Sequence, residues 1–161
     1  MELIDIIPEF NLYEEFWKIY TNSANLPPQY IAENAVVDRC IIANGTEIYG
    51  EVHSSVIGGS VTVGKGSVVR DSIIMQGVTI GENCVIEKAI IAEDTVIGND
   101  VSIGHNVTLH GACVHDNALI GMGSTLLDHA VVGEGAIVAA GALVLANTVI
   151  EPHTLWGGVP A

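Results

Sequence analysis

A six-residue spacing of large apolar residues is the feature that most limits how this chain can fold. In the C-terminal part eight successive hexads open with such a residue: Val114, Ile120, Leu126, Val132, Val138, Val144, Ile150 and Trp156. Earlier openings keep the spacing less strictly, with shorter steps after Ile86 and Leu109 that indicate loops or adjusted corners. A period of six fits neither the 3.6-residue turn of an α-helix nor a long flat strand.

A triangular coil accounts for the period, because every third hexad then returns to the same face. The repeat therefore predicts an all-β fold, a parallel β-helix over about residues 31–160, with about seven coils of about 18 residues stacked about 4.8 Å apart. The aliphatic residues point inward and stack on those of the next coil. The two ends of such a rod are open sheet edges, which need caps.

Composition agrees with a solenoid and excludes several classes of protein. Apolar residues make up 49% of the chain but aromatic residues only 5%, so the core is built from small repeated units. The longest apolar runs, such as Ala136–Val144, are far too short to span a bilayer. A net charge of −14 with five Lys and Arg would repel nucleic acid and anionic lipid, so we expect neither as a partner.

The termini and the cysteines give further expectations. Residues Met1–Asp5 show no secretory signal, so we expect a cytoplasmic protein. Cys40, Cys84 and Cys113 form no CxxC pair and are expected to be small buried apolar residues.

Residues 1–30 do not follow the repeat. The apolar spacing Leu12, Phe16, Ile19 and Tyr20 predicts a short amphipathic helix at about 11–20, and Pro27-Pro28 would then lead the chain onward in an extended form. We interpret residues 1–30 as a cap over the first coil; the alternative is a docking helix for another molecule.

The first half of the chain carries motifs of a known family. These are ELIDIIPEFNLYEEFWKIYT in residues 2–21, PPQYI in residues 27–31, IANG in residues 42–45 and GKGSVVRDSIIMQG in residues 64–77. On these motifs, the segment from residue 1 to about residue 98 resembles the C-terminal domain of glucose-1-phosphate adenylyltransferase (ADP-glucose pyrophosphorylase). The resemblance implies a left-handed β-helix that serves subunit contacts and regulation. No Gly-rich phosphate loop is present for nucleotidyl transfer.

The second half carries motifs of a different family. VSIGHNVTLHG in residues 101–111, IGMGSTLLDHAVVGEGAIVAAGALV in residues 120–144 and LWGGVPA in residues 155–161 resemble a γ-class carbonic anhydrase. The chain thus divides into a cap at 1–30, pyrophosphorylase-like coils at 31–98 and anhydrase-like coils at 99–161, in one continuous solenoid joined near Val96–Val101. We interpret it as an engineered or recombined chimera.

The anhydrase resemblance implies zinc held by three imidazoles that neighbouring subunits of a trimer share. His105 and His110 match two of these ligands, and we expect both outside the rod near a shared corner. The third ligand would lie about 14 residues before His105, where the chain has Ile90-Ile91-Ala92. With two imidazoles we expect zinc to bind weakly or not at all, and Ile91→His is the substitution expected to complete the site.

The other histidines, His53, His115, His129 and His153, are expected to be solvated. Arg70-Asp71 is likewise interpreted as a solvated corner and not as a catalytic pair.

Three functions remain open at this point. The first is a β-helix scaffold without catalytic residues, which forms a homo-oligomer. The second is a zinc-dependent carbonic anhydrase acting as a trimer. The third is a hexapeptide acyltransferase, or a regulatory or oligomerisation domain of a sugar nucleotidyltransferase; acyl transfer would need a catalytic histidine and a groove for the acyl carrier.

Overall fold

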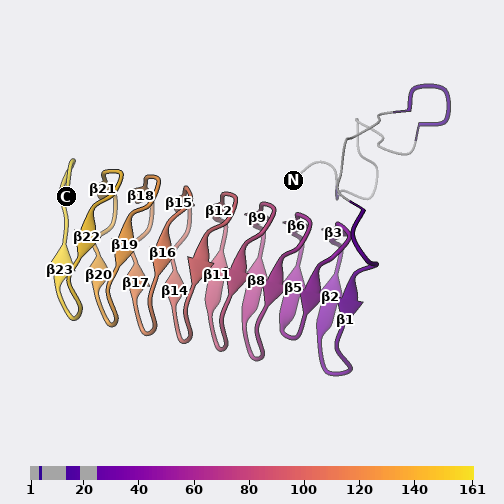
Figure 1. The fold of residues 1–161 in the computed structure, drawn as a ribbon, viewed down its shortest axis with the longest axis horizontal. Coiled ribbons are helices and arrows are strands. Elements are labelled where there is room, and N and C mark those ends of the chain that lie inside the picture. Colours follow the sequence, from indigo (N-terminus) through magenta and orange to yellow (C-terminus); the bar gives the residue numbers. More distant parts are fainter. Residues whose placement is uncertain (1–3, 5–13, 19–24) are drawn as a thin grey trace.

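Three parallel sheets form the three faces of one straight rod (Figure 1). The structure, a computed structural model, describes residues 4, 14–18 and 25–161. Face 1 contains β1 (Tyr30–Ile31), β4 (Glu47–Ile48), β7 (Thr62–Val63), β10 (Thr79–Ile80), β13 (Val96–Ile97), β16 (Cys113–Val114), β19 (Val131–Val132) and β22 (Val149–Ile150). Face 2 contains β2 (Val36–Asp38), β5 (Glu51–His53), β8 (Val68–Arg70), β11 (Val85–Glu87), β14 (Ser102–Ile103), β17 (Leu119–Ile120), β20 (Ile137–Val138) and β23 (Leu155–Trp156). Face 3 contains β3 (Ile41–Ile42), β6 (Val56–Ile57), β9 (Ile73–Ile74), β12 (Ile90–Ile91), β15 (Thr108–Leu109), β18 (Thr125–Leu126) and β21 (Leu143–Val144).

This arrangement confirms the predicted parallel β-helix of about seven turns and is consistent with the left-handed hexapeptide class. Every strand pairs in parallel with the strand three places before or after it in the sequence, as a coil with three faces requires. The rod runs without a break through the segment Val96–Val101, where β13 pairs with both β10 and β16.

The hexad openings form the core, as the repeat predicts. Seven of the eight C-terminal openings, from Val114 to Ile150, are at most 1% exposed, and only Trp156 in the last coil is partly buried. Each residue before an opening points outward, because successive side chains of a strand face opposite sides. Full burial of an aliphatic side chain of this size stabilises the fold by roughly 1.5–3 kcal/mol. The axial stack of these residues therefore holds the coils together.

Coils in the N-terminal part are shorter than the hexad repeat predicts. The paired residues Val36 and Glu51 are closer in sequence than Cys113 and Val131, which pair in the C-terminal part. The shorter coils turn their corners with fewer residues, and some of these residues take a left-handed conformation, for example Asp71 (φ 49°) and Lys88 (φ 50°). The tight corners explain why the hexad frame drifts before Leu109.

The predicted N-terminal helix is not present where the structure describes it. Half of the segment at 11–20 lies outside the described residues, but in the described half residues 15–17 form bends, and Phe16 and Trp17 are exposed. A single short helix is marginal in water unless its apolar face packs against a partner. In the described part Phe16 has no such cover, so the apolar spacing alone misled the prediction.

The cysteines are less buried than predicted. Cys84 is buried, but Cys40 and Cys113 are only partly buried, and all three are free thiols. Cys113 immediately precedes the inward-facing Val114, so strand alternation turns its side chain outward. Among the residues that the structure describes, no helix is long and apolar enough to cross a membrane.

Candidate functional site

His105 lies outside the rod, in the turn that links β14 on face 2 with β15 on face 3. Ile103 and Val107 on either side of the turn are buried in the core, at 3% and 1% exposure. Asn106 takes a φ of 59°, a left-handed conformation that asparagine tolerates better than most residues. The turn thereby leaves half of the His105 side chain exposed.

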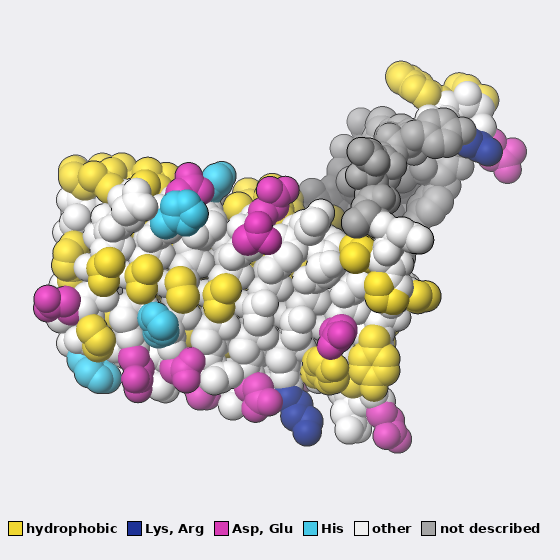
Figure 2. Space-filling model, viewed as in Figure 1, with side chains coloured by type: hydrophobic (Ala, Val, Ile, Leu, Met, Phe, Trp, Pro, Cys, Tyr) yellow, Lys and Arg dark blue, Asp and Glu magenta, His cyan; other side chains and the backbone are white. Residues whose placement is uncertain are grey.

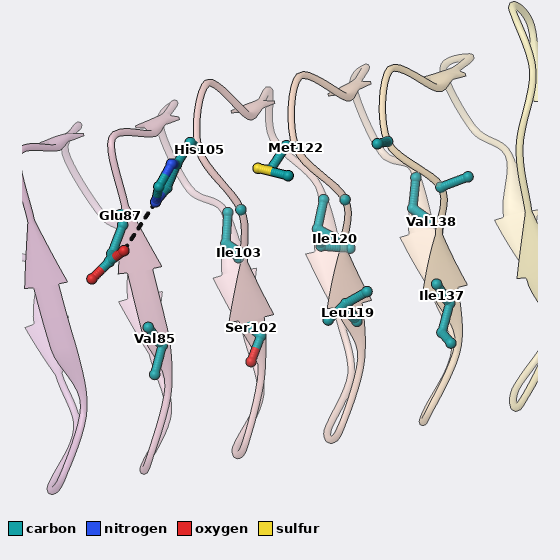
Figure 3. A pocket seen from close by; sticks show the side chains of 14 residues that line it. Val85, Glu87, Ser102, Ile103, His105, Leu119, Ile120, Met122, Ile137 and Val138 are labelled. Carbon is teal, nitrogen blue, oxygen red and sulfur yellow. Dashed lines mark hydrogen bonds and ion pairs between the residues drawn. The ribbon is translucent and has the colours of Figure 1, made fainter.

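A carboxylate from the preceding coil orients this imidazole. Nε2 of His105 lies 3.0 Å from Oε2 of Glu87 (Figure 3). Nη1 of Arg70, one coil earlier again, donates a hydrogen bond of 3.0 Å to Oε1 of Glu87. The hydrogen bond with His105, followed by that from Arg70, lowers the pKa of Glu87 below its usual value. Glu87 thus joins three successive coils, and Nδ1 of His105 has no partner among the described residues.

A mostly apolar groove of about 480 Å³ runs along the rod beside the His105–Glu87 pair. One wall is the row of outward side chains Val85, Leu119 and Ile137, with the smaller Ser102 between the first two (Figure 3). Figure 2 shows hydrophobic side chains in a row along this part of the rod. Contiguous exposed apolar side chains are a common feature of surfaces that bind ligands or other proteins.

Small residues keep the groove open along the rod. Gly104, Gly121 and Ala139 follow the inward residues of β14, β17 and β20. A Cβ atom at Gly121 would clash with the Ala140 backbone nitrogen, so the coils approach too closely there for any side chain. At its N-terminal end the groove is bounded by Glu87, where the corner residues are no longer small.

His110 lies at the next corner, after β15, where the chain turns from face 3 to face 1. Its Nδ1 is 2.5 Å from Oδ1 of Asp128 in the following coil, and 61% of the side chain is exposed. The pair lines a second hollow of about 420 Å³, whose other residues include Ala92, Asp94 and His129. Like His105, His110 is held at one ring nitrogen by a carboxylate.

The two candidate zinc ligands do not share a corner within one chain, contrary to the sequence-based expectation. Both imidazoles face outward as predicted, but His105 lies before β15 and His110 after it, and each lines its own hollow. Within residues 4, 14–18 and 25–161, no three His, Cys, Asp or Glu side chains are placed to hold a metal ion. A single chain therefore does not fit a zinc ion at these residues.

The strand register also corrects the position expected for the third ligand. Ile91 pairs with Leu109, so Ala92 is in register with His110. Ile91 is 0% exposed and belongs to the core, whereas Ile90 points outward from face 3. The substitution Ile91→His would therefore bury an imidazole in the core, whereas the residue in register with His110 is Ala92.

Glu87 and Asp128 were not identified from the sequence. Each lies 18 residues from its histidine, which is one coil away along the rod. A search for acidic residues one coil from each candidate histidine would have found both. The residues expected to be solvated have these surroundings. Arg70 donates a hydrogen bond to Glu87, and Asp71 occupies a turn with a left-handed φ. Nε2 of His53 lies 3.3 Å from a carboxylate oxygen of Glu51.

Glu87→Gln should lower stability at neutral pH and leave it unchanged in acid. A carboxyl whose pKa is lowered by folding adds stability above its unfolded pKa, and this stability is lost as the pH falls through the folded pKa. We expect the denaturation midpoints of wild type and variant to differ at pH 7 and to converge as Glu87 takes up a proton. Glu134→Gln, at an exposed position, is the control, and a difference that stays constant with pH would rule out the ion pair.

Two family models match the chain. The GlmU-like, C-terminal hexapeptide family matches residues 23–112, which is more than half of the chain and extends past the sequence-based boundary at 98/99. The bacterial transferase hexapeptide family, with six repeats, matches residues 114–146.

Curated relatives resemble part of the chain. Glucose-1-phosphate adenylyltransferase from Lachnospira eligens is 64% identical over 63 residues, which cover 39% of this chain and 15% of that protein. The enzyme of the same name from Clostridioides difficile is 50% identical over 78 residues, which cover 48% of this chain and 20% of that protein. The matches thus span a fifth or less of these relatives.

Solved structures resemble the chain in fold. UDP-N-acetylglucosamine acyltransferase from Francisella novicida has a TM-score of 0.57 and 18% identity, covering 75% of this chain and 62% of that one. UDP-N-acetylglucosamine O-acyltransferase from Moraxella catarrhalis has a TM-score of 0.51 and 15% identity, covering 78% and 66%. At these identities the likeness concerns the fold alone.

Proposed function

The chain belongs to the GlmU-like, C-terminal hexapeptide family, and we propose that it is a β-helix scaffold with little or no catalytic activity, which keeps part of a γ-class carbonic anhydrase zinc site. One observation carries this proposal. Ala92 occupies the position in register with His110, where the anhydrase-like site would need an imidazole from the preceding coil. A methyl group cannot bind a metal, and zinc sites in proteins normally use three or four protein ligands.

We further infer that the chain is an engineered or recombined chimera. Its first half resembles glucose-1-phosphate adenylyltransferase, and its second half carries the motif GHNVTLHG of residues 104–111 that suggests an anhydrase. A parallel β-helix suits such a join, because one coil contacts only its two neighbours. In this proposal the first half supplies coils for assembly or regulation, as a domain of a sugar nucleotidyltransferase would.

Self-association is part of the same proposal. His105 and His110 lie at the two ends of one short strand, at successive corners of the rod. If copies pack side by side around a threefold axis, His105 of one copy can approach His110 of the next. The carboxylates Glu87 and Asp128 support such a role, since metal-binding histidines usually donate their second ring N–H to an oxygen acceptor.

Carbon dioxide hydration tests this function directly. We expect the wild-type chain, supplied with excess zinc, to accelerate the reaction no more than the same amount of aqueous zinc, because two imidazoles leave the ion poorly held. A stopped-flow assay with a pH indicator measures the rate. Turnover at the level of a true anhydrase, abolished by His110→Ala, would overturn the proposal and favour an active zinc enzyme.

Acyl transfer is the second candidate, and the groove beside His105 favours it. A histidine held at Nε2 by a carboxylate, with Nδ1 available, has the arrangement of a general base. The groove would take the extended apolar part of an acyl donor. His105 would remove the proton of an acceptor hydroxyl as its oxygen attacks the thioester carbonyl. The C–S bond would then break to leave an ester, and the imidazolium of His105 would return the proton to the leaving thiolate. This candidate ranks second because five Lys and Arg give little attraction for a phosphorylated carrier.

An uncharged acyl thioester separates the two candidates. If the groove serves acyl transfer, decanoyl-pantetheine should bind in calorimetry, and transfer to a small alcohol should fall at least tenfold in His105→Ala. His110→Ala, at the other corner, is the matched control. No binding, or equal loss in both variants, would exclude acyl transfer at this groove.

A further inference from the structure

A cysteine and a histidine lie side by side on face 1, outside both hollows described above. Cys113 is in β16, and His115 follows the inward-facing Val114, so both side chains are on the outside of the rod. Their Sγ and Nε2 atoms are 4.0 Å apart, at the outer limit of a hydrogen bond to sulfur. The two atoms are therefore brought together by the strand without a strong interaction between them.

The neighbouring coils leave room around this pair. Ile97 pairs with Val114 and Val114 with Val132, so the residues in register with His115 are Gly98 and Gly133. No side chain flanks the imidazole on either side along the rod from these positions. His115 is exposed and Cys113 partly buried, so solvent and ions reach the pair directly.

The gap has the size that a metal ion needs. A zinc ion binds sulfur at about 2.3 Å and an imidazole nitrogen at about 2.0–2.1 Å, so a straight S–metal–N unit spans roughly 4.3–4.4 Å and a bent one less. The 4.0 Å separation accepts an ion with little movement of either side chain. A thiolate and an imidazole are soft or borderline ligands, a combination that suits copper(I) as well as zinc.

The number of ligands selects between these ions. Asp116, the nearest acidic neighbour in sequence, is engaged at the corner, where Oδ1 accepts a hydrogen bond from the Asn99 backbone nitrogen. Within the described residues no third ligand completes a set of three. Zinc seeks four ligands, whereas copper(I) is stable with two.

We propose that Cys113 and His115 form a two-coordinate surface site for copper(I). The ion replaces the thiol proton of Cys113 and binds Nε2 of His115, so one proton is released for each ion bound. The site is separate from His105 and His110 and does not depend on the function proposed for them.

The full-length chain, reduced and free of metal, tests the proposal with copper(I) as the probe. Under argon, with copper(I) presented as its bicinchoninate complex, the wild type should remove one equivalent per chain. Cys113→Ser and His115→Ala should each weaken this uptake at least tenfold. Both side chains face outward, so neither change enters the core, and circular dichroism checks the fold.

Two controls assign any copper to the right residues. Cys40→Ser removes the other partly buried thiol, and His153→Ala removes an exposed histidine that lines neither hollow; both should keep wild-type uptake. The proposal is wrong if the wild type takes up no copper, if Cys113→Ser retains it, or if Cys40→Ser loses as much as Cys113→Ser does.

Discussion

Replacing Ile97 by alanine should lower the free energy of unfolding by about 2–5 kcal/mol, the range observed when a buried isoleucine or leucine is cut back to alanine. Ile97 is 1% exposed and lies in β13, where the two sequence resemblances meet. Its side chain stacks between Ile80 and Val114 of the adjacent coils, so truncation leaves a cavity in a continuous core. Urea unfolding followed by circular dichroism measures the loss.

The adjacent residue provides a matched control. Val96 belongs to the same strand but points outward and is 46% exposed, so Val96→Ala should cost less than about 1 kcal/mol. If both variants lost the same stability, or if Ile97→Ala had no effect, the segment would not be part of a packed core. That result would contradict a rod that is continuous across Val96–Val101.

Ala92→His should raise bound zinc from well below one to about one ion per chain and should produce measurable carbon dioxide hydration. Ala92 lies between Met75 and His110 in the stack of coils, at the corner where His110 lies. A new imidazole there would give one copy two ligands, and His105 of a neighbouring copy would supply the third. Three imidazoles bind zinc firmly and leave a position for water.

Ile90→His is the control for this experiment. Ile90 is 42% exposed on the same coil, so the variant adds an imidazole without burying it, but two residues before the corner. It should leave the zinc content unchanged. Equal zinc uptake by both variants would show surface binding, and no gain from Ala92→His would mean that the coil register does not form an anhydrase-like site.

The fold was predictable because the residues buried along the axis of the rod recur every six residues. A residue such as Leu126 must be apolar wherever it faces the axis, so the hexad openings are visible in the amino-acid sequence and prove to be buried. Corners are less constrained. Asp71 takes a left-handed conformation without the glycine that usually signals one, so the short corners before Ile86 were not foreseen. In the described residues 14–18 the predicted helix is absent for another reason, since the apolar Phe16 has no packing partner there.

The candidate site was predictable only in part. Strand alternation after Leu109 correctly places His110 outside the rod, and the turn after β14 does the same for His105. Their partners Glu87 and Asp128 come from adjacent coils, each 18 residues away, so the motif that contains the two histidines does not contain them. The expected third-ligand position, Ile91, lies in the core in register with Leu109. A single-residue error moves a side chain from the surface into the core.

The zinc content and the solution mass of one wild-type sample, measured together, test the central claim most directly. The claim is that this β-helix keeps two ligands of a shared zinc site and lacks the third at Ala92. After equilibration with zinc and dialysis, light scattering should give the mass of an oligomer, and elemental analysis should find well under one zinc per chain. One firmly held zinc per chain in a trimer, lost in His105→Ala and in His110→Ala, would contradict it.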